Sequence, residues 1–370
     1  PLLRFSATND SSTPEIEVHW INEDQRHLLP LDMELSPEGI SRWMRRRTIP
    51  RNRAYVNRLL AKCGLNANRP MGILALCKGL SVDDSYWVVE EGFEGTFEKY
   101  NLFENRFSEV LALIAFTGYG SSNRSSLASS PEFTTNGMLP KCWRRISGKV
   151  TLYKGGTDGG YNTGAEPYCE YYAAQVAAAM GIDAIPYGLS QWKGRLCSTC
   201  ELFTDIDHAY MPIGNLVQKG GFDAVAAYYE NLGEPFQKAF RDMLVFDAVI
   251  CNTDRHYGNF GFMIDNKNNT IAAPAPLFDH GNSLFNQAGP EDYESPEAFQ
   301  QYIDTLVPCV YDDFFATAKR FMTDENREQL RKLLGFRFKR HVRYNLPPKR
   351  LKLMEEQVRK RAMRLLENKE

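Results

Sequence analysis

The stretch from residue 233 to residue 264 limits the possible folds of this chain more than any other segment. Apolar side chains recur at helical spacing over 233–250, which predicts a long helix with one buried face. The next segment, 252–259, is almost entirely polar, and 260–264 is apolar enough for a short strand. A polar loop between two buried elements is held at the edge of a core, and such loops commonly carry function. We therefore take 252–259 as the most informative segment.

One acid interrupts the apolar face of this helix. Asp247 falls on the same face as Phe240 and Leu244, which is unusual for a carboxylate. We interpret Asp247 as a structural group that is bonded to nearby backbone donors.

Composition indicates a folded protein of two or three structural units. The chain has 370 residues, and domains usually hold about 100–200 residues. Hydrophobic residues make up 43%, which is enough for a large core and excludes a disordered tail or a disulfide-stapled miniprotein. The 44 Lys and Arg residues nearly balance 46 Asp and Glu residues, so no global basic field exists. We therefore do not expect direct binding to nucleic acid.

The expected location is the cytoplasm. No apolar run approaches the roughly 18 residues needed to span a bilayer, and the polar stretch after the first five residues does not resemble a signal peptide. Cys197 and Cys200 form the one CxxC pair, and we interpret them as reduced thiols on a pair of strands rather than a zinc site. A reducing compartment fits this cysteine usage, and we expect no contact with a membrane.

Helices dominate the expected leading segment. Ser36 and the proline after it predict a helix to about Arg47. A second helix is predicted over 53–63 and a third over 101–116. Six arginines gather here: Arg45, Arg46, Arg47, Arg51, Arg53 and Arg58. We interpret them as solvated helix faces, and the alternative is a docking surface for nucleic acid or an acidic partner.

The middle of the chain is predicted to hold a loop, a hairpin and an Ala-rich helix. Residues 118–135 are rich in Gly, Ser and Thr, and they could form a flexible linker or a mobile loop leading into a nucleotide site. Two short strands within 143–153 predict a hairpin, and a helix is predicted over 166–180. Further strands are predicted over 185–189 and 196–203.

Three polar residues follow the long helix in a fixed order. Asp254 and Asn259 are five residues apart in the polar loop, and Asp279 comes twenty residues after Asn259, in a second loop. Phosphoryl transfer uses such a set, because one carboxylate accepts the proton of the nucleophile while an amide oxygen and another carboxylate hold Mg²⁺. The spacing therefore predicts a nucleotide-dependent phosphotransferase, with Asp254 as base and with Asn259 and Asp279 as metal ligands.

These loops resemble those of a known family. The motifs N-x-D-x-H-x-x-N at 252–259 and F-D-x-G at 278–281 resemble the HipA family of bacterial serine/threonine kinases. They are also similar to the D-R-H-x-x-N and D-x-G loops of phosphatidylinositol 3/4-kinases. The resemblance runs from about residue 129 to the C-terminal helices. It implies an α+β, bilobal, protein-kinase-like fold that holds ATP and Mg²⁺ between its lobes.

The resemblance also implies how the chain is divided. We expect a small N-terminal accessory domain over 1–117 and a kinase N-lobe, with the phosphate loop and hinge, over 118–213. A mostly helical C-lobe over 214–370 would carry the catalytic and metal-binding loops.

Several upstream residues acquire roles from the same resemblance. Lys154 would contact the α/β phosphates and pair with Glu170, with Glu166 as the reserve candidate. Adenine would meet backbone groups near Glu201, Leu202 and Phe203.

The phosphate loop departs from common patterns. No Walker A motif is present, and no GxGxxG precedes Lys154. The matching stretch is 134–141, where Gly137 would let the backbone approach phosphates and Lys141 would add charge. His256 is grouped with the nucleotide site, where it and Arg255 would brace the catalytic loop rather than react.

The resemblance further implies partners and regulation. The expected acceptor is a Ser/Thr hydroxyl of a protein, and an antitoxin-like protein partner is an open possibility. In the resembled family, autophosphorylation in the hydroxyl-rich loop that adjoins the phosphate loop expels this loop and silences the enzyme. The candidate hydroxyls within 121–135 are Ser129, Ser130, Thr134 and Thr135.

Three rival interpretations stay open at this point. The D-R-H-x-x-N wording also suits a lipid or small-molecule kinase. A non-catalytic nucleotide-binding module, such as a pseudokinase or toxin-like protein, is the rival outside enzymes. A metal-dependent hydrolase could use His256, Asp254 and Asp279.

Overall fold

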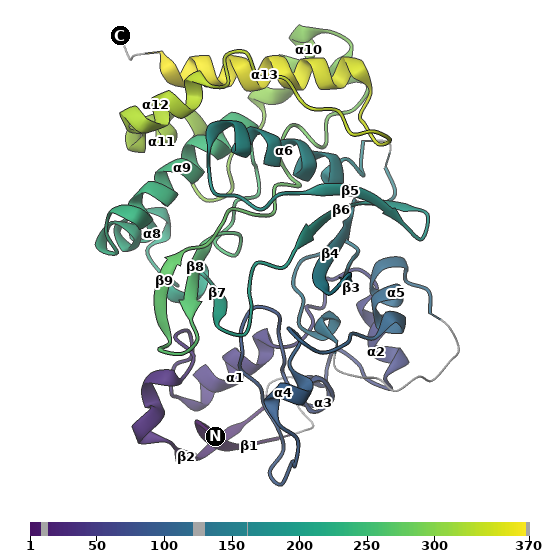
Figure 1. The fold of residues 1–370 in the computed structure, drawn as a ribbon, viewed down its shortest axis with the longest axis vertical. Coiled ribbons are helices and arrows are strands. Elements are labelled where there is room, and N and C mark those ends of the chain that lie inside the picture. The colour runs from purple at the N-terminus through teal and green to yellow at the C-terminus, as the bar shows by residue number, and fades with distance from the viewer. Residues whose placement is uncertain (9–13, 121–129, 161, 368–370) are drawn as a thin grey trace. The chain divides into compact units, whose positions relative to one another are not determined.

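The computed structural model describes residues 1–8, 14–120, 130–160 and 162–367 (Figure 1). It contains both helices and sheets, as expected for the predicted α+β class. The chain divides into two compact units, each assembled from three separate stretches. Unit 1 consists of Pro1–Lys154, Glu201–Met211 and Met263–Ala272, and unit 2 consists of Gly155–Cys200, Pro212–Phe262 and Ala273–Glu370. The predicted boundaries at 117 and 213 stay a prediction, because both units are discontinuous in sequence.

The strands of the described residues form three sheets, in the orders β1-β2, β3-β4-β6-β5 and β7-β8-β9. Their bounds are β1 (Leu3–Ala7), β2 (Ile16–Ile21), β3 (Lys141–Ile146), β4 (Lys149–Gly155), β5 (Gly188–Trp192), β6 (Arg195–Glu201), β7 (His208–Pro212), β8 (Gly261–Asp265) and β9 (Thr270–Pro274). The predicted hairpin is confirmed, because β3 and β4 pair antiparallel with Lys141 opposite Lys154. Ser147 and Gly148 take positive φ values of 50° and 85° in its turn, as a two-residue hairpin loop requires.

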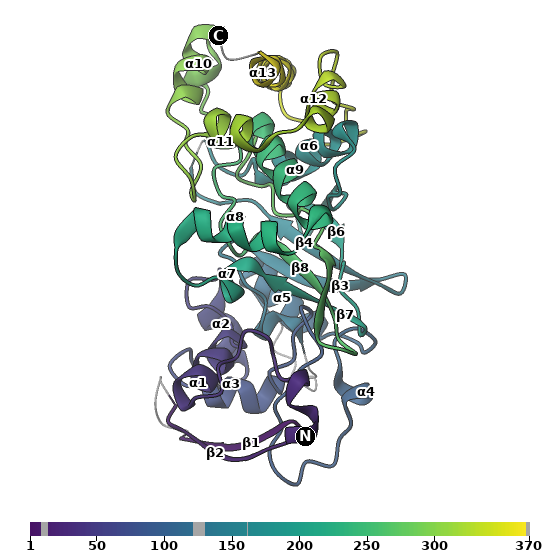
Figure 2. The same ribbon diagram turned by 90° about the vertical axis from the view of Figure 1, so that its left-hand side faces the viewer.

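The helices of unit 1 are short. They are η1 (Glu23–Leu28), α1 (Pro37–Arg46), α2 (Val56–Lys62), α3 (Pro70–Cys77), α4 (Phe97–Tyr100), α5 (Glu109–Thr117) and η2 (Pro131–Phe133). Ser36 caps α1 by accepting a hydrogen bond from the Gly39 N–H, at 3.0 Å, which confirms the predicted start. Figure 2 shows the β1-β2 ribbon under α1, and the apolar side chains of both meet in a cluster that includes Phe5, Val18 and Met44.

Two predicted helices in unit 1 are shorter than expected. The helix predicted over 101–116 begins only at Glu109, because the Asn101 side chain accepts hydrogen bonds from the N–H groups of Phe103 and Glu104, at 3.1 and 2.9 Å. This local turn competes with a helical start, and Ser108 caps the helix instead. The helix predicted from residue 53 begins at Val56, after Tyr55 takes a left-handed φ of 59°.

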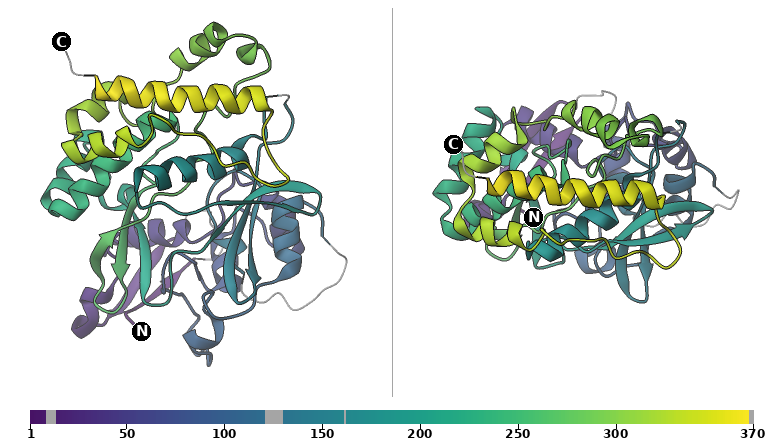
Figure 3. Two further views of the ribbon diagram at one scale, coloured as in Figure 1. Left: turned by 45° about the horizontal axis from the view of Figure 1, so that its top comes forward. Right: turned by 90° about the horizontal axis from the view of Figure 1, so that it is seen from above.

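Unit 2 is mostly helical. Its helices are α6 (Glu166–Met180), α7 (Ile213–Leu216), α8 (Gly221–Asn231), α9 (Glu234–Ile250), η3 (Glu291–Tyr293), α10 (Pro296–Asp304), α11 (Phe314–Phe321), α12 (Asp324–Arg331) and α13 (Pro348–Leu366). The helices predicted over 166–180 and 233–250 are confirmed. The second half of α9 is buried and packs against α11 and α13 (Figure 3), so the polar loop at its C-terminal end starts from a fixed point.

One strand prediction in unit 2 is displaced. Residues 185–187 lie outside β5, which begins at Gly188. The Ile185 N–H donates to the Leu277 carbonyl at 2.8 Å, and Ala184 forms an isolated parallel bridge with Leu277. This part of the predicted strand therefore pairs with the segment that leads into Asp279.

Candidate active site

The polar loop after α9 is anchored to the helix by its first residue. Asn252 is fully buried, its N–H donates to the Asp247 carbonyl at 3.1 Å, and its side-chain amide donates to the Asp247 carboxylate at 3.2 Å. The Asn252 side-chain oxygen accepts the Asp254 N–H at 3.2 Å. The position of the Asp254 backbone is therefore set by the end of α9.

A buried arginine joins this loop to the second one. Arg255 forms a two-pronged ion pair with Asp247, at 2.9 and 3.0 Å, and both side chains are almost fully buried. Its Nη1 donates to the carbonyls of Asn259, at 3.2 Å, and Phe278, at 2.5 Å. Arg255 thus holds the backbone of one predicted metal ligand and of the residue before the other. The predicted bracing role of Arg255 is confirmed.

The interpretation of Asp247 needs a correction. Its carboxylate is bonded to the guanidinium of Arg255 and the side-chain amide of Asn252, not to backbone donors. A carboxylate this deep needs a charged partner, and an arginine eight residues later supplies it. Burial alone lowers the pKa of Arg255, but the charge and hydrogen bonds of Asp247 more than offset this, so the pKa is raised.

The second loop is fixed through its backbone. Asp279 is partly buried, has a left-handed φ of 56°, and donates its N–H to the Tyr187 hydroxyl at 3.1 Å. The next residue, His280, is buried and donates its N–H to the Glu170 carboxylate at 3.2 Å. The His280 Nδ1 accepts from Arg255 at 3.0 Å, which places the ring proton on Nε2. Burial, then the charge of Glu170, raise the pKa of Tyr187 well above its usual value, so its hydroxyl stays neutral.

Asn282 links the two loops directly, and the sequence motifs assigned it no role. Its side-chain amide donates to Oδ2 of Asp254 at 2.8 Å. Its carbonyl accepts both the N–H and the hydroxyl of Thr253, at 3.0 and 3.1 Å. The signal that could have pointed to it is an amide three residues after Asp279, in a loop already assigned to the site.

Asn259 and His256 complete the catalytic loop. Asn259 is buried, and its amide nitrogen donates to the Asp254 carbonyl at 3.1 Å, which turns its oxygen away from that contact. His256 is exposed, and its Nδ1 accepts the Gly258 N–H at 3.0 Å. The contact found for His256 is a turn within its own loop, so its grouping with the nucleotide stays a prediction.

The predicted phosphate loop lies in unit 1. Residues 136–138 are exposed between buried ends, and the Lys141 ammonium donates to the Asn136 carbonyl at 2.9 Å. Gly137 has a φ of 90°, and a Cβ at that position would collide with Nζ of Lys141. The Lys141 side chain could move away from such a Cβ, so the positive φ is the feature that favours glycine here, as expected for a loop whose backbone approaches a ligand closely.

Other predicted N-lobe residues are placed as follows. Lys154 is buried at the end of β4 in unit 1, and Glu170 is buried on α6 in unit 2, so their pairing stays a prediction. In the predicted hinge, Glu201 pairs with Lys149 at 2.7 Å, and the Leu202 N–H donates to the Val150 carbonyl at 2.9 Å. Phe203 packs edge-on against Tyr210. Adenine contacts in this stretch remain a prediction.

The candidate autophosphorylation hydroxyls are held inside the fold where they are described. Ser130 and Thr134 are buried, and Ser130 caps η2. The Thr135 hydroxyl donates to the Pro131 carbonyl at 2.7 Å and accepts from the Trp143 indole at 3.0 Å. Residues 121–129, which include Ser129, lie outside the described residues.

Cys197 and Cys200 lie in β6 and form no disulfide. Within the described residues, no cluster of three or more His, Cys, Asp or Glu side chains is placed to hold a metal ion. No helix in the same part of the chain is long and apolar enough to cross a membrane.

Comparison with known proteins supports the kinase resemblance. No family model matches the chain. The serine/threonine-protein kinase CtkA of Helicobacter pylori is 27% identical over 135 residues, a match that spans 33% of this chain and 41% of CtkA. The crystal structure of H. pylori CtkA, described as a proinflammatory kinase, has a TM-score of 0.51 at 16% identity and covers 63% of this chain and 90% of that one.

A second solved structure is HipA of Shewanella oneidensis MR-1, in a toxin–antitoxin complex with HipB and operator DNA. It has a TM-score of 0.49 at 13% identity, and it covers 98% of this chain and 95% of that one.

The fold therefore defines a kinase-like α+β protein. Within that class, the sequence match to CtkA supports the HipA-like kinase family that the motifs at 252–259 and 278–281 indicated. The match spans less than half of CtkA.

Proposed function

We propose that the chain is an ATP-dependent phosphotransferase that acts on a serine or threonine hydroxyl of a protein. The observation that carries this proposal is the double fixation of Asp254. Its carboxylate accepts a hydrogen bond from the side-chain amide of Asn282, in the second loop, at 2.8 Å. Its main-chain carbonyl accepts one from the side-chain amide of Asn259 at 3.1 Å. One carboxylate is thereby oriented by both loops that phosphoryl transfer requires.

Asp254 would orient and deprotonate the acceptor hydroxyl. Asn282 occupies Oδ2, so we assign the hydroxyl to Oδ1. A base in this role must be presented in one orientation, because misplacement by about 1 Å can cost roughly 100-fold in rate. The bonds from Asn252 and Asn282 restrain Asp254 at its backbone and at its carboxylate.

Asn259 and Asp279 would hold Mg²⁺. Their donor atoms are an amide oxygen and a carboxylate, the hard oxygens that this ion prefers. The amide nitrogen of Asn259 is engaged by Asp254, which leaves the oxygen as the coordinating end. When bound, Mg²⁺ neutralises phosphate charge during transfer. Arg255, through the carbonyls of Asn259 and Phe278, would keep both ligands in register.

The remaining roles come from the family resemblance. Lys154, paired with Glu170, would position the α/β phosphates, and Gly137 and Lys141 would line the phosphate loop. Backbone groups near Glu201, Leu202 and Phe203 would meet adenine. Positioning and charge neutralisation would supply most of the rate enhancement.

The test combines nucleotide binding with transfer. Asp254→Asn should abolish transfer of labelled phosphate from Mg-ATP to a generic Ser/Thr protein substrate and to the chain itself. Mg-ATP should still raise the unfolding temperature of this variant, because binding stabilises the folded state by mass action. Asp304→Asn, an exposed carboxylate on α10, is the matched control and should behave as wild type. An active Asp254→Asn variant would refute the assignment.

Other results of the same test separate the rivals. Stabilisation by Mg-ATP without transfer to any protein, but with transfer to a lipid or small hydroxyl compound, would favour the lipid or small-molecule kinase. Nucleotide binding with no transfer at all would favour a non-catalytic module. Stabilisation by metal without nucleotide would favour the hydrolase.

Regulation and partners are separate proposals. Autophosphorylation at Ser130 or Thr134 would require these residues to leave their buried positions, and at Thr135 it would break the hydroxyl's bonds to Pro131 and Trp143. Ser129 is the fourth candidate. Intact-mass analysis with peptide mapping after incubation in Mg-ATP tests this, and an unmodified segment in an active enzyme would contradict it. The antitoxin-like partner is tested by co-purification from the native host, where recovery of the chain alone would count against it.

A further inference from the structure

The arginine-rich segment does more than present a solvated surface. Arg45, Arg51 and Arg58 are exposed, as the sequence interpretation expected. Arg47 and Arg53, in contrast, are only 5% and 3% exposed. For these two residues the interpretation as solvated helix faces is wrong, and their buried contacts need an explanation.

Arg53 contacts both ends of the predicted phosphate loop. Its Nη1 donates to the carbonyls of Glu132, at 2.5 Å, and Thr135, at 3.4 Å. Its Nη2 donates to the Glu132 carboxylate, at 2.5 Å, and to the Lys141 carbonyl, at 2.9 Å. One guanidinium thus joins the residues just before the loop to the residue that closes it.

Two neighbouring contacts extend this clamp. The other Glu132 oxygen accepts the Trp143 N–H at 2.8 Å, which ties the ion pair to the start of β3. Ala54, next to Arg53, donates its N–H to the carbonyl of Met138 at 2.9 Å. Hydrogen bonds from Arg53 and Ala54 therefore hold the exposed tip of the loop, 136–138, and the residues on either side of it.

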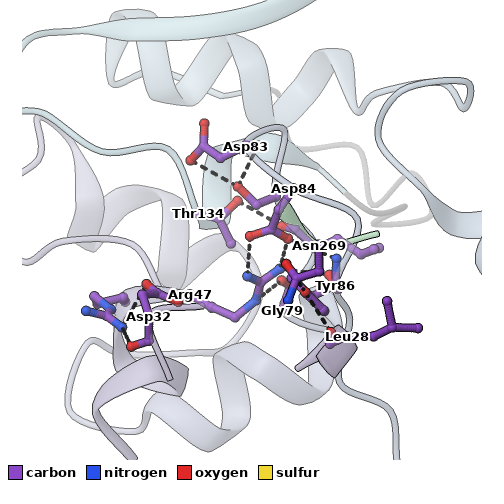
Figure 4. A network of polar contacts seen from close by, with 12 residues as sticks. Leu28, Asp32, Arg47, Gly79, Asp83, Asp84, Tyr86, Thr134 and Asn269 are labelled. Carbon is purple, nitrogen blue, oxygen red and sulfur yellow. Dashed lines mark hydrogen bonds and ion pairs between the residues drawn. The ribbon is translucent and has the colours of Figure 1, made fainter. Parts of the chain in front are cut away.

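Arg47 supports the same loop from a second direction (Figure 4). It donates to the Gly79 carbonyl at 2.7 Å and to both carboxylate oxygens of Asp84, at 2.7 and 2.8 Å. These contacts fix the stretch that includes Leu80. The Leu80 carbonyl in turn accepts the Thr134 hydroxyl at 2.8 Å, which attaches the first residue of the loop.

Stability alone is a poor explanation for such a buried ion pair. Desolvation of the two charges offsets most of their attraction, and well-packed apolar residues of similar volume often serve as well or better. A planar guanidinium with several fixed donors does, however, impose a geometry that a lysine ammonium does not. The burial of Arg53 is therefore best explained by the loop conformation that it imposes.

We propose that Arg53 is a positioning residue for the phosphate groups of the nucleotide, because it fixes the loop that presents Gly137 and Lys141. This proposal rests on the proposed function. It assigns part of the ATP site to the leading 117 residues, which the sequence treated as an accessory domain. Arg47 contributes to the same geometry indirectly, through Leu80 and Thr134.

The test compares ligands with and without phosphates. Arg53→Lys keeps the positive charge but loses the planar guanidinium with its fixed donors. Arg53→Met with Glu132→Gln removes both charges, keeps an acceptor for the Trp143 N–H, and avoids leaving a lone buried carboxylate. Arg51→Met, an exposed arginine two residues away, is the matched control. Affinities for Mg-ATP and for adenosine are measured by calorimetry, together with backbone hydrogen exchange over 132–143 without nucleotide.

We expect both Arg53 variants to bind Mg-ATP about tenfold more weakly, equivalent to about 1.4 kcal/mol, while adenosine affinity stays within about twofold. Hydrogen exchange should accelerate in 134–141 and remain unchanged in unit 2. Equal losses for both ligands, or no loss for either, would overturn the positioning role. If wild type binds neither ligand, the proposed function itself fails, whereas normal wild-type binding with unaffected variants refutes only this inference.

Discussion

Two buried arginines, Arg255 in unit 2 and Arg53 in unit 1, hold the two groups of residues that the proposed chemistry requires. Each pairs with a buried carboxylate, Asp247 or Glu132, and each also donates to backbone carbonyls of a functional loop. The partners of Arg255 lie 4 to 25 residues away in sequence. Those of Arg53 lie 79 to 88 residues away.

This difference explains why one site can be read from the sequence and the other cannot. Arg255 and its partners fall within one continuous stretch, which runs from α9 through the polar loop and the strands β8 and β9 to the loop of Asp279, so sequence motifs record them together. Arg53 belongs to a segment with no motif, and its partners are reached only through the tertiary fold. Two buried arginine–carboxylate pairs of the same kind therefore differ in whether a sequence motif reveals them.

The largest expected effect comes from removing the buried ion pair between Arg255 and Asp247 in unit 2. Arg255→Met leaves the buried Asp247 carboxylate without its counter-charge, which should lower the free energy of unfolding by about 3–5 kcal/mol. Urea denaturation measures this loss. Arg337→Met, an exposed arginine of unit 2, serves as the control and should change stability little. A loss for Arg255→Met below about 1 kcal/mol would show that the pair is dispensable to folding.

A second change separates orientation from folding at the catalytic loop. Asn282→Ala removes the side-chain donor to Oδ2 of Asp254, and we expect transfer to slow by about 10- to 100-fold while Mg-ATP affinity is kept. Steady-state kinetics with a Ser/Thr protein substrate and calorimetry with ATP measure the two quantities. Asn231→Ala, at the exposed end of α8, is the control. An equal loss of ATP affinity would assign Asn282 to nucleotide binding instead.

A third prediction concerns pH and the network around Arg47 (Figure 4). Burial, followed by the charge of neighbouring Asp84, raises the pKa of Asp83 to about 6, while Ser81 and Arg47 oppose the shift. The folded state then holds a proton that the unfolded chain has released, so stability should fall as pH rises from about 4 to about 6. Asp83→Asn should flatten this part of the stability profile by up to about 3 kcal/mol, because each pKa unit of the shift is worth about 1.4 kcal/mol. An unchanged slope in denaturation series at several pH values would contradict it.

The smallest expected effect tests the second route to the phosphate loop. Thr134→Val removes the bond to the Leu80 carbonyl and leaves that acceptor buried, at a cost of about 1 kcal/mol. Mg-ATP affinity should fall by a few-fold, less than for the Arg53 variants, because Arg53 still clamps both ends of the loop. Thermal unfolding and calorimetry measure both effects. A larger loss of affinity than Arg53→Lys causes would rank Leu80 and Thr134 above Arg53.

Local patterns predicted much of the secondary structure. The capped start of α1, the hairpin at Ser147-Gly148 and the full lengths of α6 and α9 followed from caps, glycines and apolar periodicity. The errors arose where a side chain or a distant segment intervened. The Asn101 side chain accepts two backbone N–H groups, so α5 begins later than predicted. The Ile185 N–H donates to the Leu277 carbonyl, so Ile185 lies outside the predicted strand.

The candidate site was predictable to a similar extent. The order of Asp254, Asn259 and Asp279 could be read from spacing, and the loops that carry them are bonded together in unit 2. The partner of Asp247 was misjudged, because periodicity shows that a residue faces inward but not what it meets. Asn282 was missed because an amide in a polar loop is ordinary until its neighbour across the fold is known.

The discontinuous composition of unit 1 has a consequence for biosynthesis. Its last stretch, Met263–Ala272, emerges from the ribosome only after all of Pro212–Phe262, which belongs to unit 2. Unit 1 therefore cannot be completed before residue 272 has been added, and a fragment that stops at residue 154 lacks β7, β8 and β9. During synthesis both units stay incomplete until their last segments have been made. Nascent chains of intermediate length should therefore expose apolar surface and need protection from aggregation.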